Sequence, residues 1–323
     1  MSQKRTRLLI LNLAMDENHS MLSHQVEVVE RLMPHFENVG VVTHTKGKLN
    51  SVLEKSVSIH IITTFRIYNI FKLVKSLLFA VKILRSEKPD VIFSHMATKL
   101  SLLIWPIAKL LNVRQVLWYA HASNSIFLRL VNLLGITLVS STVESIPVSF
   151  RNSVLIGQGI PEELFLFRRS QENKLNKCVH VGRLDSSKKI EEIMDAVAQA
   201  RASHPGLTLT FIGTPSNSHN FDYLESLKLK WRWAISEGWI IFTGPMERKE
   251  LADHIRKYDI FIHAYQGSLD KALIEASMAG LLVVTTNESY CREFGLNKYF
   301  TGHTLSDRLM LSLSWDLDTR ITF

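Results

Sequence analysis

Short apolar runs rich in β-branched residues alternate along the whole chain with longer amphipathic segments. This alternation is typical of a parallel sheet covered by helices, because its strands are buried on both faces. The fold class that we expect is therefore α/β. The predicted strands are 8–13, 39–43, 57–62, 91–94, 116–118, 138–140, 154–156, 178–181, 207–212, 240–242, 260–262 and 282–285.

The length indicates two domains, because 323 residues are roughly twice the size of one. Glycine and proline punctuate the chain from Gly157 to Pro161, and a charged stretch, 168–177, follows. We predict a boundary there, with 1–157 and 158–323 as two Rossmann-like α/β domains. Ligands bind such folds at the carboxyl ends of the strands, so we expect a cleft where the two domains face each other.

Composition excludes several classes of protein. A hydrophobic share of 46% and a charged share of 21% exclude a disordered chain. The two cysteines, Cys178 and Cys291, are too few for a disulfide scaffold and favour a reducing compartment. The longest apolar window, 100–111, falls short of the roughly 20 residues that span a bilayer. We therefore expect a cytoplasmic protein without a membrane-spanning helix.

Positive charge is concentrated in the first half. Residues 1–157 hold 18 basic and 9 acidic residues, a net charge of +9, whereas 158–323 carry 20 and 21, a net charge of −1. A basic half suits an anionic partner, either nucleic acid or anionic lipid. No basic-aromatic platform or recognisable binding motif supports nucleic acid, so the pattern favours an anionic membrane surface.

The segment 67–85 has the spacing of an amphipathic helix whose apolar stripe has a basic flank. Its apolar stripe is expected to pack on the sheet and consists of Ile67, Ile70, Phe71, Val74, Leu77, Leu78, Val81 and Leu84. The simpler interpretation is sheet cover with a solvated edge of Lys72, Lys75, Lys82 and Arg85. A second interpretation adds peripheral binding to anionic lipid, because Leu73, Phe79 and Ile83 lie off the stripe and enlarge the apolar surface.

The strongest local motif is the segment 181–190, where a strand ends at Gly182 and a polar turn leads into a helix. Arg183 and Lys188 flank that helix start, so a guanidinium and an ammonium can converge beside the positive end of the helix dipole. That arrangement suits a diphosphate. We expect both cations to face solvent; the alternative is a solvated loop with two ordinary cations.

A second motif, 267–286, runs from a loop into a helix that carries Glu275 between Ile274 and Ala276. An unpaired carboxylate among such neighbours is costly, so we expect a partner for it, such as ribose hydroxyls. The alternative is an exposed helical glutamate.

These two motifs, together with the segment "IGQGI", resemble the GT-B glycosyltransferases of family 4, and the likeness covers nearly the whole chain. The resemblance implies that Arg183 and Lys188 hold a donor diphosphate and that Glu275 binds the ribose. Gly182, Gly244, Asp270 and Lys271 complete the expected donor-binding set. The sequence departs from the family where an acid normally contacts the transferred sugar, because Gly267 stands there, and Asp270 or Lys271 is a candidate substitute.

The resemblance also assigns residues in the first half. His95 and His121 match two strand-end histidines, and His121 is the expected catalytic residue near the transferred sugar, beside Arg183 and Lys188. Ser23 and His24 lie in the expected acceptor loop, with His95, although Ser23 stands where the family commonly has glycine. Either strand-end histidine has an alternative interpretation as an ordinary loop residue.

The function that these residues imply is a retaining, metal-independent hexosyltransferase of polysaccharide biosynthesis. It takes a nucleotide-diphosphate sugar as substrate, needs no cofactor, and acts on a glycan or lipid-linked acceptor at the inner face of the cell membrane. One alternative is an inactive subunit that binds a nucleotide sugar or a partner glycosyltransferase, favoured by Gly267 and by a tail that stops soon after the core motif. A nucleotide-sugar epimerase is a further alternative that needs a carboxylate set not found here.

Overall fold

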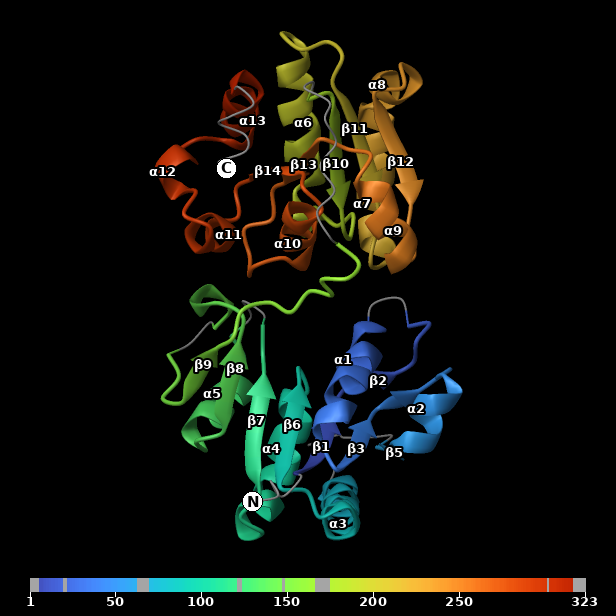
Figure 1. Cartoon of the computed structure of the whole chain (residues 1–323), viewed down its shortest axis with the longest axis vertical. Coiled ribbons are helices and arrows are strands. Elements are labelled where there is room, and N and C mark those ends of the chain that lie inside the picture. Colours follow the sequence, from blue (N-terminus) through green and yellow to red (C-terminus); the bar gives the residue numbers. More distant parts are fainter. Residues whose placement is uncertain are drawn as a thin grey trace. The chain divides into compact units, whose positions relative to one another are not determined.

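The computed structural model describes residues 6–19, 22–62, 70–120, 124–146, 149–165, 175–300 and 302–315. Contacts divide the chain into two compact units, Met1–Gly157 and Gln158–Phe323 (Figure 1). Each predicted strand is present with its ends shifted by at most two residues. The predicted α/β fold is thus confirmed. None of the helices within the described ranges is long and apolar enough to cross a membrane.

The N-terminal unit is built on a parallel sheet in the order β5-β3-β1-β6-β7-β8-β9. Chain order reverses between β1 and β6, which makes this pair the topological switch point, where ligands bind in such sheets. Two short strands that the sequence did not predict, β2 (Ala14–Met15) and β4 (Thr45–Lys46), pair separately. The main strands are β1 (Arg7–Leu11), β3 (Asn38–Thr43), β5 (Ser58–Ile61), β6 (Val91–His95), β7 (Arg114–Trp118), β8 (Thr137–Ser140) and β9 (Ser153–Leu155).

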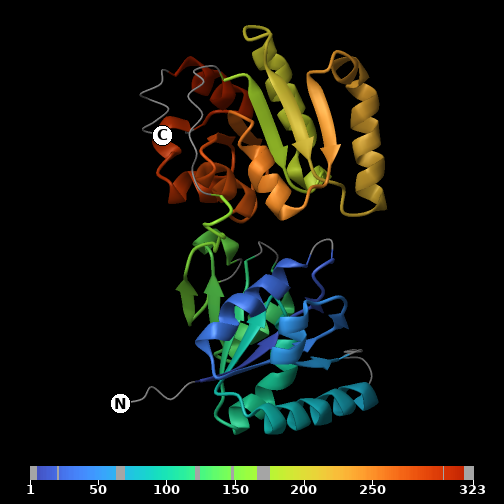
Figure 2. The ribbon, with the colours of Figure 1, turned by 45° about the vertical axis from the view of Figure 1, so that its right-hand side comes forward.

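Helices cover both faces of this sheet (Figure 2). On one face α1 (His24–Leu32) and α2 (Ser51–Ser56) pack on side chains such as Ile10 and Val41. On the other, α3 (Ile70–Glu87) and α4 (Thr98–Leu110) pack on Leu9 and Leu11. The helix α5 (Ile126–Leu133) covers β7 and β8, and two short 3-10 helices are η1 (Met33–His35) and η2 (Val143–Ser145).

The helix α3 corrects the predicted apolar stripe. Phe71 is 79% exposed and Leu78 64%, and Val74 is exposed as well. The packed face holds Leu84 of the predicted stripe together with Ala80 and Ile83, and its margin holds Leu77 of that stripe together with Leu73 and Phe79. The helix has apolar residues of its own on all sides, so the periodicity of the sequence alone did not identify the face that is buried. Two small residues, Ser76 and Ala80, are buried on this side of the helix. Ile67 lies outside the described residues.

The C-terminal unit repeats the plan with a parallel sheet in the order β12-β11-β10-β13-β14, and its switch point lies between β10 and β13. Its strands are β10 (Lys177–Val181), β11 (Thr208–Ile212), β12 (Ile240–Gly244), β13 (Ile260–His263) and β14 (Leu282–Thr285). One face is covered by α6 (Ile190–Arg201), α7 (Ser218–Lys230), α8 (Arg232–Ser236) and α13 (Leu305–Ser314). The other is covered by α9 (Arg248–Ile255), α10 (Lys271–Met278), α11 (Glu288–Glu293) and α12 (Asn297–Phe300).

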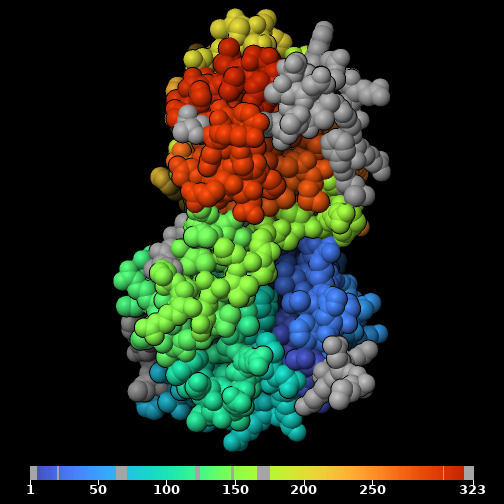
Figure 3. All heavy atoms as spheres, turned by 60° about the vertical axis from the view of Figure 1, so that its left-hand side comes forward, coloured from blue at the N-terminus to red at the C-terminus, as the bar shows by residue number. Residues whose placement is uncertain are grey.

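The last helices form part of the outer surface of this unit and appear in orange and red in the space-filling view (Figure 3). The strands beneath them are buried on both sides, as the four fully buried residues of β13 show. Burying an unpaired polar side chain in such a strand costs free energy, so the polar side chains at the carboxyl edge are expected to have partners.

Candidate functional site

Three glycines lie at the carboxyl ends of adjacent strands. Gly182, Gly213 and Gly244 follow or end β10, β11 and β12, and each has a positive φ. A Cβ on Gly213 would overlap the carbonyl oxygen of Gly182. The Gly182 amide donates to the Ile212 carbonyl at 3.0 Å, and the Gly213 amide to the Gly244 carbonyl at 3.0 Å. Only glycine permits this close approach of backbones, which leaves an edge without side chains.

Two histidines mark the switch point of the C-terminal sheet. His180 on β10 and His263 on β13 are fully buried, and their rings stack with centroids 5.9 Å apart. His180 Nδ1 lies 3.0 Å from the Ile262 carbonyl oxygen, which can only accept, so that nitrogen carries the proton. Burial lowers the pKa of His180 to about 3 and also lowers the pKa of His263. Both rings are therefore neutral at physiological pH.

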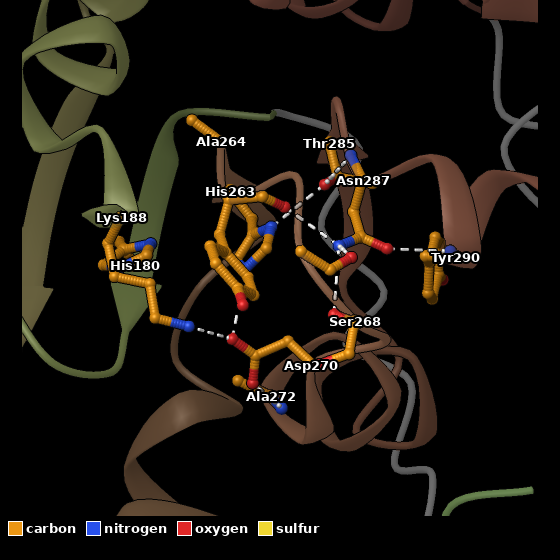
Figure 4. Close-up of polar contacts among 12 residues, drawn as sticks. His180, Lys188, His263, Ala264, Ser268, Asp270, Ala272, Thr285, Asn287 and Tyr290 are labelled. Carbon is orange, nitrogen blue, oxygen red and sulfur yellow. Dashed lines mark hydrogen bonds and ion pairs between the residues drawn. The ribbon is translucent and has the colours of Figure 1, made fainter. Parts of the chain in front are cut away.

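Asp270 connects this pair to Lys188 (Figure 4). Its carboxylate accepts from the Lys188 ammonium and lies 3.3 Å from His263 Nε2. The Thr285 hydroxyl accepts from the Asn287 amide at 3.0 Å and lies 3.1 Å from His263 Nδ1. The Asp270 carboxylate can only accept, so His263 Nε2–H donates to it, and Nδ1 of the neutral ring accepts from the Thr285 hydroxyl. Burial opposes ionisation of Asp270, but the His263 hydrogen bond and the Lys188 charge outweigh it and lower the pKa of that carboxyl.

The structure separates the two predicted cations. Arg183 is a half-exposed side chain, 53%, and lies 3.2 Å from Asp185, which also accepts from the Ser216 amide and hydroxyl. Lys188 is only 9% exposed at its side chain, and its ammonium lies 4.0 Å from the Tyr265 ring centroid. The expectation that both cations face solvent is thus wrong for Lys188, because Asp270, 82 residues away, pairs with it.

Glu275 is buried, with 8% of its surface exposed, so the alternative of an exposed helical glutamate is wrong. The chain itself supplies a partner that the sequence did not indicate, because Arg248 Nη2 on α9 donates to Glu275 Oε1 at 2.5 Å. Burial raises the pKa of Glu275, and Arg248 and Lys271 oppose that rise. Lys271 is the first residue of α10, and Asp270 is its N-cap, accepting from the Ala272 amide at 3.3 Å.

The loop that carries Gly267 is fixed from behind. Asn287 Nδ2 lies 2.9 Å from the Tyr265 carbonyl oxygen and 3.3 Å from those of Gly267 and Ser268. Asn287 is itself fully buried and caps α11 by accepting from the Tyr290 amide (Figure 4). A Cβ on Gly267 would overlap the hydroxyl and the outer ring carbons of Tyr265. The Tyr265 side chain therefore occupies the space next to residue 267.

The N-terminal switch point brings together two predicted residues. The rings of His24, on α1, and His95, at the end of β6, meet edge to face with centroids 5.5 Å apart. Gln25 Oε1 accepts from the amides of Leu13 and Ala14 and thereby holds the loop after β1. Ser23 has an ordinary helical conformation and makes no side-chain cap. The predicted catalytic His121 lies outside the described residues.

Several site residues escaped the sequence argument, namely His180, Gly213, Arg248, His263, Tyr265 and Asn287. Two of them had a usable signal, because a histidine inside an otherwise apolar strand run is unusual. The others become visible only through contacts between distant segments.

The strand orders and the likeness to solved structures show the fold of this chain as GT-B, with two Rossmann-like domains. HepE of Anabaena in complex with UDP-glucose superposes with a TM-score of 0.64 at 15% identity, over 98% of this chain and 97% of that one. A glycosyltransferase of Rickettsia africae gives a TM-score of 0.68 at 14% identity, covering 98% and 94%. WaaG, a glycosyltransferase involved in lipopolysaccharide biosynthesis, gives 0.62 at 11% identity, covering 95% and 90%.

The likeness to a protein family lies in the C-terminal unit. Residues 176–303 match the family model described as glycosyl transferases group 1. The resemblance predicted from the sequence is therefore confirmed over this segment, which contains Arg183, Lys188, Asp270 and Glu275. No curated protein matches the chain by sequence.

Proposed function

We propose that this chain is a retaining glycosyltransferase that moves a sugar from a nucleotide-diphosphate donor to a glycan or lipid-linked acceptor. One observation carries the proposal: the segment that matches group 1 glycosyltransferases contains Arg183, Lys188 and Glu275, and these lie beside the carboxyl edge of the C-terminal sheet. That edge is where open parallel sheets bind ligands.

The donor diphosphate is assigned to the turn after β10. Gly182 and Gly244 open the backbone, and Arg183 supplies an accessible guanidinium. Lys188 adds an ammonium whose position is set by Asp270. Donors aimed at the charge that grows on a leaving diphosphate each contribute about 3 kcal/mol to catalysis. With this positive charge built into the chain, the proposed reaction needs neither a metal ion nor a cofactor.

The nucleoside is assigned to α10. Arg248 holds Glu275 Oε1, and we assign the other carboxylate oxygen to the ribose hydroxyls. On the acceptor side, His24, His95 and Ser23 lie at the switch point of the N-terminal sheet, and His121 is the proposed catalytic residue beside the transferred sugar. Retention follows if the leaving phosphate itself assists the acceptor hydroxyl on the same face of the sugar, as the family resemblance implies.

A thermal-shift screen of the full chain against UDP-, GDP- and ADP-sugars tests the donor assignment. We expect one nucleotide to raise Tm in the wild type and the shift to be lost in Arg183→Ala. Lys189→Ala is the matched control, because Lys189 lies in the same turn and pairs with Glu192 at the surface. Equal shifts in all three proteins would contradict the role of Arg183.

Membrane attachment is the second part of the proposal. The outer face of α3 combines exposed Phe71, Val74 and Leu78 with exposed Lys75, Lys82 and Arg85, which recur at three- and four-residue spacing. Apolar side chains flanked by cations suit the interface of an anionic leaflet, and each nearby cation contributes about 1 kcal/mol. This face supports a peripheral protein that reaches lipid-linked acceptors at the cytosolic membrane surface.

Vesicle co-sedimentation tests this surface. A variant with Lys75, Lys82 and Arg85 changed to Gln should lose binding to vesicles that contain acidic lipid, and wild-type binding should weaken with salt. A control variant with Lys249, Lys257 and Lys298 changed to Gln removes the same charge from the C-terminal unit and should bind as the wild type does. Equal loss in both variants would contradict a role specific to α3.

An inactive subunit that binds a nucleotide sugar is the second candidate. Gly267 favours it, because no side chain stands where the family has a sugar-contacting acid. Hydrolysis of the bound donor separates the two: slow release of free sugar supports the transferase, and binding without release or transfer supports the inactive subunit.

A further inference from the structure

We propose that Tyr265 contacts the transferred sugar of the donor and that residue 267 is glycine because the Tyr265 ring fills the space of its side chain. This inference rests on the proposed function and deepens it by assigning a residue to the sugar end of the donor.

The geometry places Tyr265 directly beside the assigned diphosphate site. Its ring centroid lies 4.0 Å from the Lys188 ammonium, a cation-π contact. The side chain is partly exposed, and its hydroxyl has no hydrogen-bond partner among the described residues. A phenol that is held at a binding edge with its hydroxyl accessible is available to a ligand.

The position of Tyr265 is fixed by its surroundings. Its backbone carbonyl accepts from Asn287 Nδ2 at 2.9 Å, and its ring meets His263 edge to face with centroids 6.2 Å apart. Gly267 completes the arrangement, because a Cβ there would overlap the Tyr265 hydroxyl. The backbone of Gly267 does not adopt a positive φ, so a larger residue there is opposed only by this overlap and would have to displace the Tyr265 side chain.

The order of groups along α10 indicates which part of the donor Tyr265 meets. Glu275, assigned to the ribose, lies five residues beyond Asp270, which corresponds to about 7.5 Å along a helix. Lys188, assigned to the diphosphate, pairs with Asp270 at the start of that helix. Tyr265 and Gly267 come before the helix. Going backwards along the chain from Glu275, the order is therefore the ribose site, the diphosphate site and then this loop. A donor laid out from ribose to diphosphate therefore directs its sugar toward this loop.

The chemistry of tyrosine suits that ligand. A pyranose has apolar C–H faces and a rim of hydroxyls, and a phenol offers an apolar ring and a hydroxyl that donates and accepts. A carboxylate at this place would only accept. Tyr265 therefore serves as a specificity-determining contact to the sugar.

The test compares binding of the nucleotide sugar selected by the thermal-shift screen with binding of the same nucleoside diphosphate, both by calorimetry on the full chain. The ratio of the two dissociation constants isolates the sugar contact. We expect Tyr265→Phe to weaken only the nucleotide sugar, by about fivefold, because one hydrogen bond is lost. Tyr265→Ala should weaken it by about twentyfold, because the ring contact is lost too.

The variant Gly267→Ala tests the position of the Tyr265 ring independently. Its methyl group should displace the Tyr265 side chain, so this variant should weaken the nucleotide sugar as Tyr265→Ala does. The double variant should then lose no more than either single one, since both remove one contact. Gly206→Ala is the matched glycine control, because a Cβ there meets only Asn176 Oδ1 at 3.9 Å.

The outcomes separate this inference from the proposed function. A wild type that binds no nucleotide sugar would overturn both. A wild type that binds, with the same ratio in Tyr265→Ala or with fully additive losses in the double variant, would overturn the assignment of Tyr265 alone. Unchanged Tm values in the single variants keep a folding defect from imitating the expected result.

Discussion

The two units contain the same kind of switch point but equip it differently. In the N-terminal unit the switch point between β1 and β6 brings together His24 and His95, and the net charge of +9 lies in the unit as a whole, with exposed cations on α3. In the C-terminal unit, which is nearly neutral, the switch point buries Lys188 and His263 and pairs both with the mostly buried Asp270. One sheet plan thus positions surface charge in one unit and paired, buried charge in the other.

The largest expected effect is a difference in stability between variants of the two cations in the C-terminal turn, Lys188 and Arg183. Lys188→Ala should lower the free energy of unfolding by about 3 kcal/mol, because it leaves the Asp270 carboxylate without its ammonium in a buried place. Arg183→Ala should change stability by less than about 0.5 kcal/mol, because its pair is half exposed. Both variants should lose transfer. Urea denaturation measures the difference, and equal stabilities would contradict the buried pair.

The next largest effect is a dependence of stability on pH that arises from the buried histidines of the C-terminal switch point. An unfolded histidine takes up a proton near pH 6.5, whereas folded His180, whose pKa burial lowers to about 3, does not. Its contribution to stability is therefore present above pH 6.5 and is lost as the pH falls toward 3, at about 1.4 kcal/mol per pH unit. The lowered pKa of His263 acts in the same direction below pH 6.5.

The variant His180→Asn checks this slope. Its amide keeps a donor for the Ile262 carbonyl but does not titrate, so Tm should fall less steeply between pH 6.5 and 4. His219→Asn, at an exposed position, is the control and should keep the wild-type slope. Identical slopes in both variants would remove His180 from the explanation.

The smallest effect compares helix starts in the two units. Thr304 and Asp307 form a capping box at the start of α13, so Thr304→Ala should cost about 1 kcal/mol. Ser23, before α1, makes no cap hydrogen bond, so Ser23→Ala should stay within a few tenths of a kcal/mol. Thermal unfolding of the two variants measures whether the capped start of α13 contributes more to stability than the start of α1, which has no cap hydrogen bond. A comparable cost at Ser23 would mean that its hydroxyl has a structural role.

The fold was predictable because its signal is local. Runs such as 260–262 are short, apolar and buried on both faces, and the pattern that marks them needs no knowledge of distant residues. Where local information was ambiguous, prediction failed. Apolar residues surround α3, and only packing on the sheet shows that Ile83 and Leu84 face inward while Phe71 and Leu78 face outward.

The site was predictable only in part. The spacing of Arg183 and Lys188 and the position of Glu275 identified residues at the carboxyl edge, but their partners come from distant segments. Asp270 reaches Lys188 across 82 residues, and Arg248 reaches Glu275 from the preceding helix. The space filled by Tyr265 beside Gly267 is likewise a property of the folded loop. Residue types indicate a chemistry, whereas ion pairs and filled space depend on the tertiary fold.

Hydrogen exchange of the full chain, with and without the nucleotide sugar that raises Tm, tests the central claim most directly. A donor bound at the carboxyl edge of the C-terminal sheet should slow exchange in 182–189 and 265–275, because both segments contact the ligand and lose opening fluctuations. Arg183→Ala should lose that protection at the same ligand concentration. Protection confined to other segments, with 182–189 and 265–275 exchanging as in the free protein, would contradict the assignment of the donor site.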